Sequence, residues 1–70
     1  MKLENILEYA MEDLRYYLRS KPDELRHYEK LYNAFKSSSS DEARRAAAFE
    51  ILKRHLVEAG LIGLIKGEER

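Results

Sequence analysis

The fold is decided by residues 2–36, KLENILEYAMEDLRYYLRSKPDELRHYEKLYNAFK, which hold two amphipathic helical patterns separated by a break. The first pattern predicts a helix over residues 2–19, because its apolar side chains recur at the spacing of one helix face. That face consists of Leu3, Ile6, Leu7, Ala10, Leu14, Tyr17 and Leu18, with Met11 at its edge. Acidic residues precede basic ones in this segment, an order that complements the helix dipole.

The break falls at residues 20–23, Ser-Lys-Pro-Asp. Proline fits the first turn of a helix, and Ser20 with Asp23 approximates a capping box, so we expect a second helix over residues 22–36. Its apolar face consists of Leu25, Tyr28, Leu31, Tyr32 and Phe35. Because the connection is short, the first two helices are expected to pack antiparallel.

Four consecutive serines, from Ser37 to Ser40, predict the next loop. Ser39 or Ser40 can cap a third helix over residues 41–59, and Gly60 is expected to end that helix in the left-handed conformation. Its main apolar stripe consists of Ala48, Phe49, Leu52, Leu56 and Ala59, broadened by Ile51.

These patterns predict an all-α fold: a three-helix up-down-up bundle over residues 1–60, followed by a C-terminal appendage over residues 61–70 that is a short helix or strand. A chain of 70 residues is one domain at most and lies near the lower limit at which a single apolar core suffices. It contains no cysteine, so neither a disulfide nor a thiolate metal site reinforces it. Idealised helix packing or self-association is then the expected reinforcement.

Charge and hydropathy set further expectations about the class of protein. The 13 Lys and Arg residues balance the 13 Asp and Glu residues, so no net field steers the chain toward nucleic acid. No signal-peptide pattern and no membrane-length apolar stretch occurs, which predicts a soluble, cytoplasmic protein without membrane contact. Helix formers fill the helices and breakers fall at boundaries, a consistency typical of a thermophile or a designed protein.

Two groups of apolar residues exceed what a minimal three-helix core requires. Tyr9 and Tyr16 are seven residues apart and lie well around the first helix from its main stripe. Tyrosine suits a surface where two proteins meet, although both rings can instead lie flat at the bundle edge. The third helix is apolar over most of its circumference, through Ala43, Ala46, Ala47 and Val57 on the side away from its main stripe. That pattern is typical of a central helix, or of alanines that serve helix propensity alone.

The apolar residues of the C-terminal segment also require a cover, either the end of the bundle or another molecule. Together with the tyrosines they predict a non-enzymatic module for self-association or for binding a protein partner, with no cofactor. The expected interface consists of Tyr9, Tyr16, Val57, Ile62, Leu64 and Ile65.

Signals for catalysis or metal binding are weak. Glu24 with His27 has the spacing of one half of a carboxylate-bridged di-metal site, but a second such pair is missing from the chain. His55 with Glu58 would need further ligands that the sequence does not identify. No serine stands in a recognisable relation to a histidine and an acid, and no glycine-rich phosphate loop occurs. We therefore expect no catalytic residue and no metal site.

Nucleic-acid binding is the main alternative, through Arg44, Arg45, Lys53 and Arg54 in the third helix. Residues 51–70, ILKRHLVEAGLIGLIKGEER, are similar in style to the recognition helix and first wing strand of winged-helix DNA-binding domains. The resemblance implies a strand after Gly60 and a helix that contacts DNA. The chain departs from the pattern because it ends before a second wing strand and because acidic residues interrupt the basic face.

Overall fold

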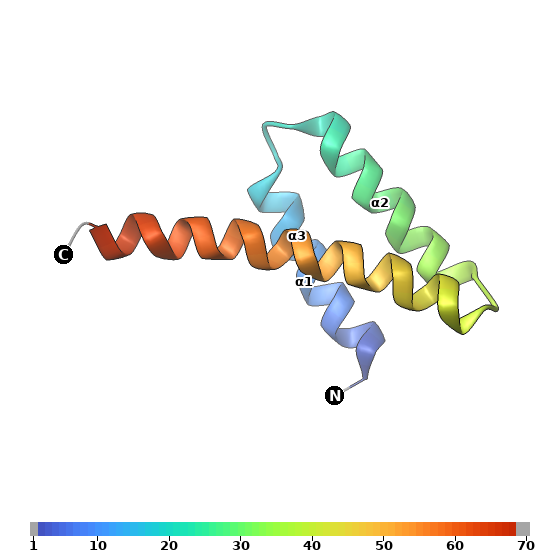
Figure 1. Ribbon diagram of the computed structural model, residues 1–70. Helices are drawn as coiled ribbons and strands as arrows, with labels where there is room; N and C mark the ends of the chain where they lie inside the picture. The colour runs from blue at the N-terminus through green and yellow to red at the C-terminus, as the bar shows by residue number, and fades with distance from the viewer. Residues whose placement is uncertain (1, 69–70) are drawn as a thin grey trace.

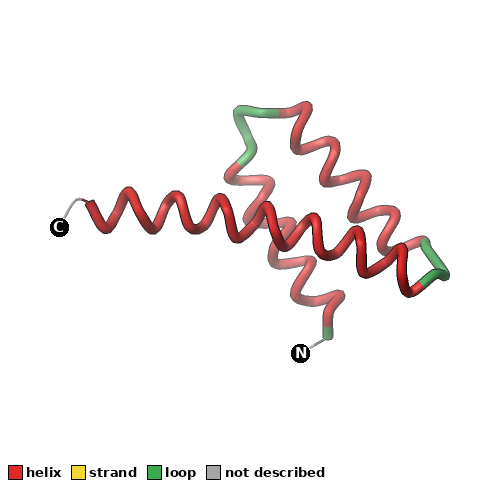
Figure 2. Tube along the Cα trace, in the orientation of Figure 1, coloured by secondary structure: helices red, strands yellow, loops and turns green. Residues whose placement is uncertain are grey.

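The computed structural model describes the backbone of residues 2–68 and the side chains of residues 2–60. It contains three helices, α1 (Leu3–Tyr17), α2 (Pro22–Ser37) and α3 (Asp41–Glu68), and no strand within the described backbone (Figure 1). Short connections join them, shown in green in Figure 2. The prediction of an all-α fold is confirmed.

Each of the three helices packs against the other two. In Figure 1, α3 runs across α1 at a wide inclination rather than alongside it, and its last turns extend beyond both other helices. The molecule is accordingly elongated, with extents of 47, 27 and 16 Å along its principal axes. The predicted up-down-up arrangement of the three axes is therefore not confirmed.

The core is built mainly on one face of α1. Its buried side chains are Leu7, Ala10, Met11, Leu14 and Leu18 from α1 and its C-terminal end, Phe35 from α2, and Ala47, Ala48 and Ile51 from α3. The remaining apolar residues predicted for α2 pack against this cluster and are partly buried. The predicted face of α1 is thus confirmed along most of its length, whereas Leu3 and Ile6 at its start are exposed.

The face that α3 buries differs from the predicted stripe. Phe49 and Leu56, both expected in the core, are 64% and 69% exposed, while Ala47, expected on the far side, is buried. The crossing geometry accounts for the difference, because an inclined helix contacts its neighbours over few turns and small residues there allow close approach. The predicted core positions of Phe49 and Leu56 were therefore wrong.

The predicted N-terminal caps of α2 and α3 are confirmed only in part. The Ala43 backbone N–H donates to Ser40 Oγ at 3.3 Å, which confirms Ser40 as the cap of α3. Pro22 is the first residue of α2, as expected, but Lys21 occupies the N-cap and provides no side-chain hydrogen bond. The capping box of Ser20 with Asp23 is therefore not formed.

The third helix does not end at Gly60 but continues to Glu68. No described glycine has a positive φ, so Gly60 does not adopt the left-handed conformation of a helix cap. Glycine inside a helix costs only about 1 kcal/mol relative to alanine, which the flanking residues can offset. Residues 61–68 thus extend α3 in place of a separate short helix or strand, and the strand implied by the winged-helix resemblance is absent from this described segment. Residues 69–70 lie outside the described part of the chain.

Candidate functional site

The most exposed large apolar residues of the described chain lie on α1 and α3. On α3, Phe49 and Leu56 have most of their surface in solvent; on α1, Tyr9 is 61% exposed and Ile6 is partly exposed. Single exposed apolar side chains are normal in folded proteins, whereas a contiguous group marks a surface that other molecules contact.

Two of these exposed residues, Ile6 and Tyr9, line a groove between α1 and α3. Ile6, Tyr9 and Ala10 from α1 line it opposite Leu52 from α3, around a pocket of about 250 Å³. Helical spacing places Phe49 and Leu56 three and four residues to either side of Leu52, on one side of α3. We call the resulting patch the α1–α3 apolar surface; it consists of Ile6, Tyr9, Phe49, Leu52 and Leu56.

A polar contact closes one end of this groove. His55 Nε2 and Asp13 Oδ2 lie 2.7 Å apart, and both residues line the same pocket. The Tyr17 ring packs near the His55 ring, with centroids 6.1 Å apart. This contact joins α1 to α3 directly at the groove.

Only part of the interface predicted from the sequence lies on this surface. Tyr9 belongs to it. Tyr16 is exposed, but its ring makes an edge contact with the Tyr17 ring and lies under the Arg19 guanidinium, 4.3 Å from the ring centroid. Val57 is 50% exposed and lines a different pocket, on the α2 side of α3. The structure therefore does not bring these three residues together.

The remaining predicted interface residues, Ile62, Leu64 and Ile65, have side chains outside the part of the chain that the structure describes. Sequence reasoning missed Phe49 and Leu56 as surface residues because both fit a core stripe. A signal was present nonetheless, since α3 carries two competing apolar faces and a helix in a three-helix chain cannot bury both.

The four basic residues of the nucleic-acid alternative point in different directions. Arg44 Nη2 donates to Glu4 Oε1 at 3.2 Å, which holds it against α1. Arg54 donates from Nη1 to Glu24 at 3.3 Å and from Nε to Glu58 at 2.8 Å. Partial burial lowers the pKa of Arg54, but these hydrogen bonds raise it more, so its pKa lies above the ordinary value.

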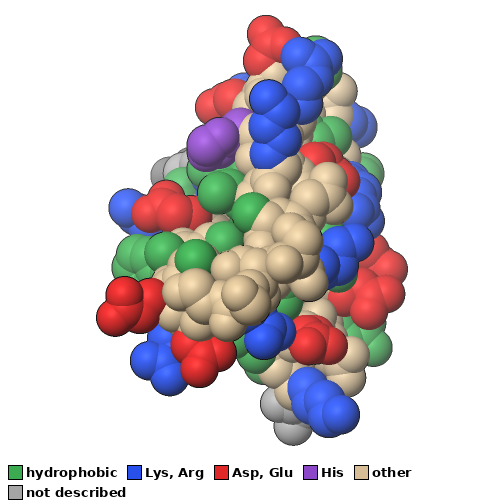
Figure 3. All heavy atoms as spheres, turned by 90° about the vertical axis from the view of Figure 1, so that its right-hand side faces the viewer, with side chains coloured by type: hydrophobic (Ala, Val, Ile, Leu, Met, Phe, Trp, Pro, Cys, Tyr) green, Lys and Arg blue, Asp and Glu red, His purple; other side chains and the backbone are tan. Residues whose placement is uncertain are grey.

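Arg45 and Lys53 are left as the exposed members of that set. Figure 3 looks onto the end of the molecule formed by the α2–α3 connection and shows acidic and basic side chains interspersed. A phosphate backbone is bound by a continuous basic surface. The described residues do not form one on this face.

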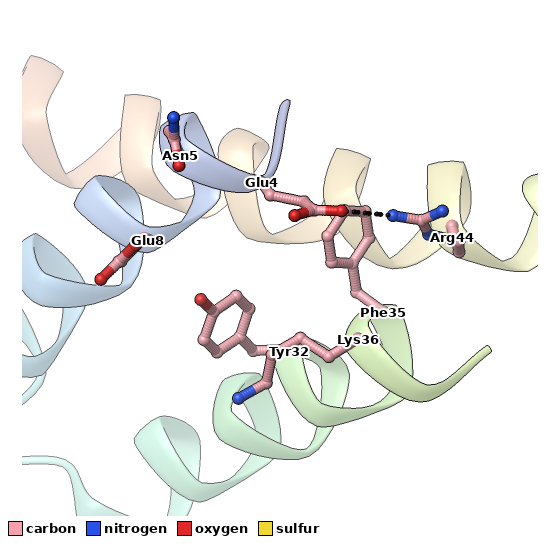
Figure 4. Close-up of a pocket in the computed structure, with 7 residues that line it drawn as sticks. All are labelled: Glu4, Asn5, Glu8, Tyr32, Phe35, Lys36 and Arg44. Carbon is pink, nitrogen blue, oxygen red and sulfur yellow. Dashed lines mark hydrogen bonds and ion pairs between the residues drawn. The ribbon is translucent and has the colours of Figure 1, made fainter. Parts of the chain in front are cut away.

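A polar pocket of about 210 Å³ opens between the start of α1 and the end of α2 (Figure 4). It is lined by Glu4, Asn5, Glu8, Tyr32, Phe35, Lys36 and Arg44. Three of its four charged residues have partners: Glu4 binds Arg44, and Lys36 Nζ lies 4.6 Å from the centroid of the Tyr32 ring, whereas Glu8 forms no ion pair with a described residue. Arg44 Nε is buried without a hydrogen-bond partner. The pocket holds no serine, cysteine or histidine that could act as an activated nucleophile.

The two weak metal signals are not brought together. Glu24 is bonded to Arg54, and the His27 ring packs on Tyr28 with centroids 5.1 Å apart. His55 and Glu58 have separate partners, Asp13 and Arg54. Among the residues that the structure describes, no three acidic or histidine side chains gather as a metal site.

No family model matches the chain, and comparison with curated proteins and with solved structures finds no match. Over the described backbone, no helix combines the length and the hydropathy that a membrane span requires. The α1–α3 apolar surface is therefore the feature of the molecule that best indicates a function.

Proposed function

We propose that this chain is a non-enzymatic helical interaction module that self-associates or binds a protein partner through the α1–α3 apolar surface. The observation that carries the proposal is the exposure of Phe49 and Leu56 beside the groove lined by Ile6 and Tyr9. Full burial of a Leu or Phe side chain contributes about 1.5–3 kcal/mol. A partner that covers this surface therefore gains stabilisation that the isolated chain does not obtain.

Chain size supports the same proposal. A chain of 70 residues has a small core, and nine residues make up the buried apolar cluster of the described part. Small domains without disulfides or metals commonly gain stability through association. Apolar residues at the centre of an interface, surrounded by polar ones, are the typical arrangement of a protein-binding surface.

The interface predicted from the sequence also includes residues in the extended end of α3. Its last turns project beyond α1 and α2, and their sequence includes Ile62, Leu64 and Ile65. We place these three residues in the interface together with Tyr9. Tyr16 and Val57 lie off the α1–α3 apolar surface, and we leave them outside the proposed interface.

The test is the solution mass measured by light scattering over a wide range of protein concentration. We expect the unmodified chain to form a dimer or larger assembly and the double substitution Phe49→Ser with Leu56→Ser to weaken association about thirtyfold or more. Circular dichroism checks that this variant keeps its helices, as its substituted side chains are exposed.

Val57→Ser is the matched control, because Val57 is also an exposed apolar residue of α3 but lies on a different side of the helix. A loss of association in Val57→Ser without one in the double variant would move the interface to that side. Ile62→Ser with Ile65→Ser then tests the extended end separately. The nucleic-acid alternative stays a prediction from the sequence, which a duplex-binding titration at low salt tests directly.

A further inference from the structure

Two ion pairs join α1 to α3 among the residues that the structure describes. Near the start of α1, Glu4 Oε1 lies 3.2 Å from Arg44 Nη2. In the later half of α1, Asp13 Oδ2 lies 2.7 Å from His55 Nε2. Arginine keeps its charge at any pH near neutrality, whereas histidine is the side chain that ordinarily changes charge between about pH 5 and pH 8. Of the two ion pairs, only the one with His55 can therefore respond to pH in this range.

Protonation changes what the His55 ring offers to Asp13. A neutral imidazole carries one proton on either nitrogen, and only one of these two forms donates from Nε2. The protonated ring always donates from Nε2, and it adds the attraction between opposite charges. The His55 side chain is 24% exposed and Asp13 is 52% exposed, so water still reaches the pair and limits the cost of a charge there. Proton uptake by the ring therefore strengthens the contact.

The other charged groups near His55 have partners of their own. Arg54, its neighbour on α3, is bonded to Glu58 of the same helix and to Glu24 of α2. From α1, the uncharged Tyr17 ring lies beside the imidazole, with centroids 6.1 Å apart. Within the described part of the chain, the carboxylate on α1 is therefore the one charge to which His55 is bonded.

We infer that the Asp13–His55 contact is a pH-sensitive link between α1 and α3, which strengthens when the imidazole takes up a proton. The two residues are 42 positions apart in the sequence, so folding brings them together. The folded chain thus gains stability as the pH falls through the range where histidine titrates, near pH 6.5. It loses this gain below about pH 4, where carboxylates take up protons. The link is a property of the fold and does not depend on the proposed function.

The test is the equilibrium constant of unfolding, measured by urea denaturation between about pH 5.5 and pH 8. Dilute solution keeps association from adding to the apparent stability. We expect the unfolding constant of the unmodified chain to be about two- to fivefold smaller at the acid end, as partly exposed ion pairs give. Asp13→Asn keeps the shape of the side chain and removes its charge, so it should abolish most of this dependence. His55→Gln should abolish it as well.

His27→Gln is the matched control, because the chain contains two histidines and no cysteine. The His27 ring is exposed on α2 and packs on Tyr28, with centroids 5.1 Å apart. The acids that precede it at helical spacing, Asp23 and Glu24, are bonded to arginines. This variant should keep the pH dependence of the unmodified chain. The amino terminus titrates in the same range but is common to every variant, so its effect cancels.

A double-mutant cycle gives a second measurement that holds even if one variant is destabilised. The coupling between Asp13→Asn and His55→Gln, expressed as a factor in the unfolding constant, should be about two- to fivefold larger at the acid end. A pH dependence that is absent from the unmodified chain, persists in Asp13→Asn or disappears in His27→Gln overturns the inference. None of these results bears on the proposed function, which the association of Phe49→Ser with Leu56→Ser decides.

Discussion

α1 and α3 differ in the kind of apolar side chain that each buries. α1 encloses large residues such as Leu7 and Leu14, whereas α3 buries two alanines and Ile51 and exposes Phe49 and Leu56. The hydrophobic stabilisation of a side chain depends on the surface it removes from water. α1 therefore supports the fold of its own chain, while the largest apolar side chains described on α3 contribute little to it. A residue that adds little to folding is available for binding.

Shortening one leucine in each helix is expected to produce the largest difference between α1 and α3. Leu14→Ala should lower the free energy of unfolding by about 2–5 kcal/mol, because Leu14 is fully buried and its removal leaves a cavity. Leu56→Ala should change it by no more than about 0.5 kcal/mol, because that side chain is mostly in solvent. Urea denaturation followed by circular dichroism measures both changes.

Protein concentration must be held low in that measurement, since association adds to apparent stability. At high concentration, Leu56→Ala should lose part of the concentration-dependent stability that the unmodified chain shows. Equal losses for the two leucines in dilute solution would contradict the division of roles between α1 and α3.

The alanines on the buried face of α3 allow a second test of how α3 packs. Ala48 is 4% exposed in the region where α3 meets the other helices. Ala48→Leu should cost about 1–3 kcal/mol, because a larger side chain forces the helices apart. Ala46→Leu is the matched control on the exposed side of α3 and should leave the unfolding free energy nearly unchanged. A tolerant Ala48→Leu would mean that close approach of the helices does not depend on small residues.

The sequence was sufficient to predict the fold class and the core face of α1. A single apolar stripe gives a helix one choice of buried face, and Leu7, Leu14 and Leu18 are buried as that stripe requires. α3 carries several apolar faces, so its buried side depends on how it crosses α1 and α2. Helical periodicity contains no information about that crossing, and Phe49 was therefore placed in the core.

The candidate site was predictable only in part for the same reason. Tyr9 was identified because it lies off the main stripe of α1, and the structure places it on the exposed surface. Leu52 and Leu56 could not be assigned to that surface, since the groove exists only once α1 and α3 are packed. The contact between Asp13 and His55 could likewise not be predicted from local spacing, because the two residues are 42 positions apart in the sequence.

A substitution at Gly60 distinguishes a third helix that ends at this residue, as expected from the sequence, from the continuous α3 of the structure. Its expected effect on the free energy of unfolding is small, but the two cases predict opposite signs. As the left-handed cap expected from the sequence, Gly60→Ala would destabilise the chain, because a side chain disfavours a positive φ. In the continuous helix, a Cβ at this position meets no atom within 4 Å, and alanine has the higher helix propensity. Gly60→Ala should then raise the unfolding free energy by about 0.5–1 kcal/mol, measured by urea denaturation. Since the substitution adds only a methyl group, the sign of the change decides whether Gly60 lies inside a continuous α3 or ends it in the left-handed conformation.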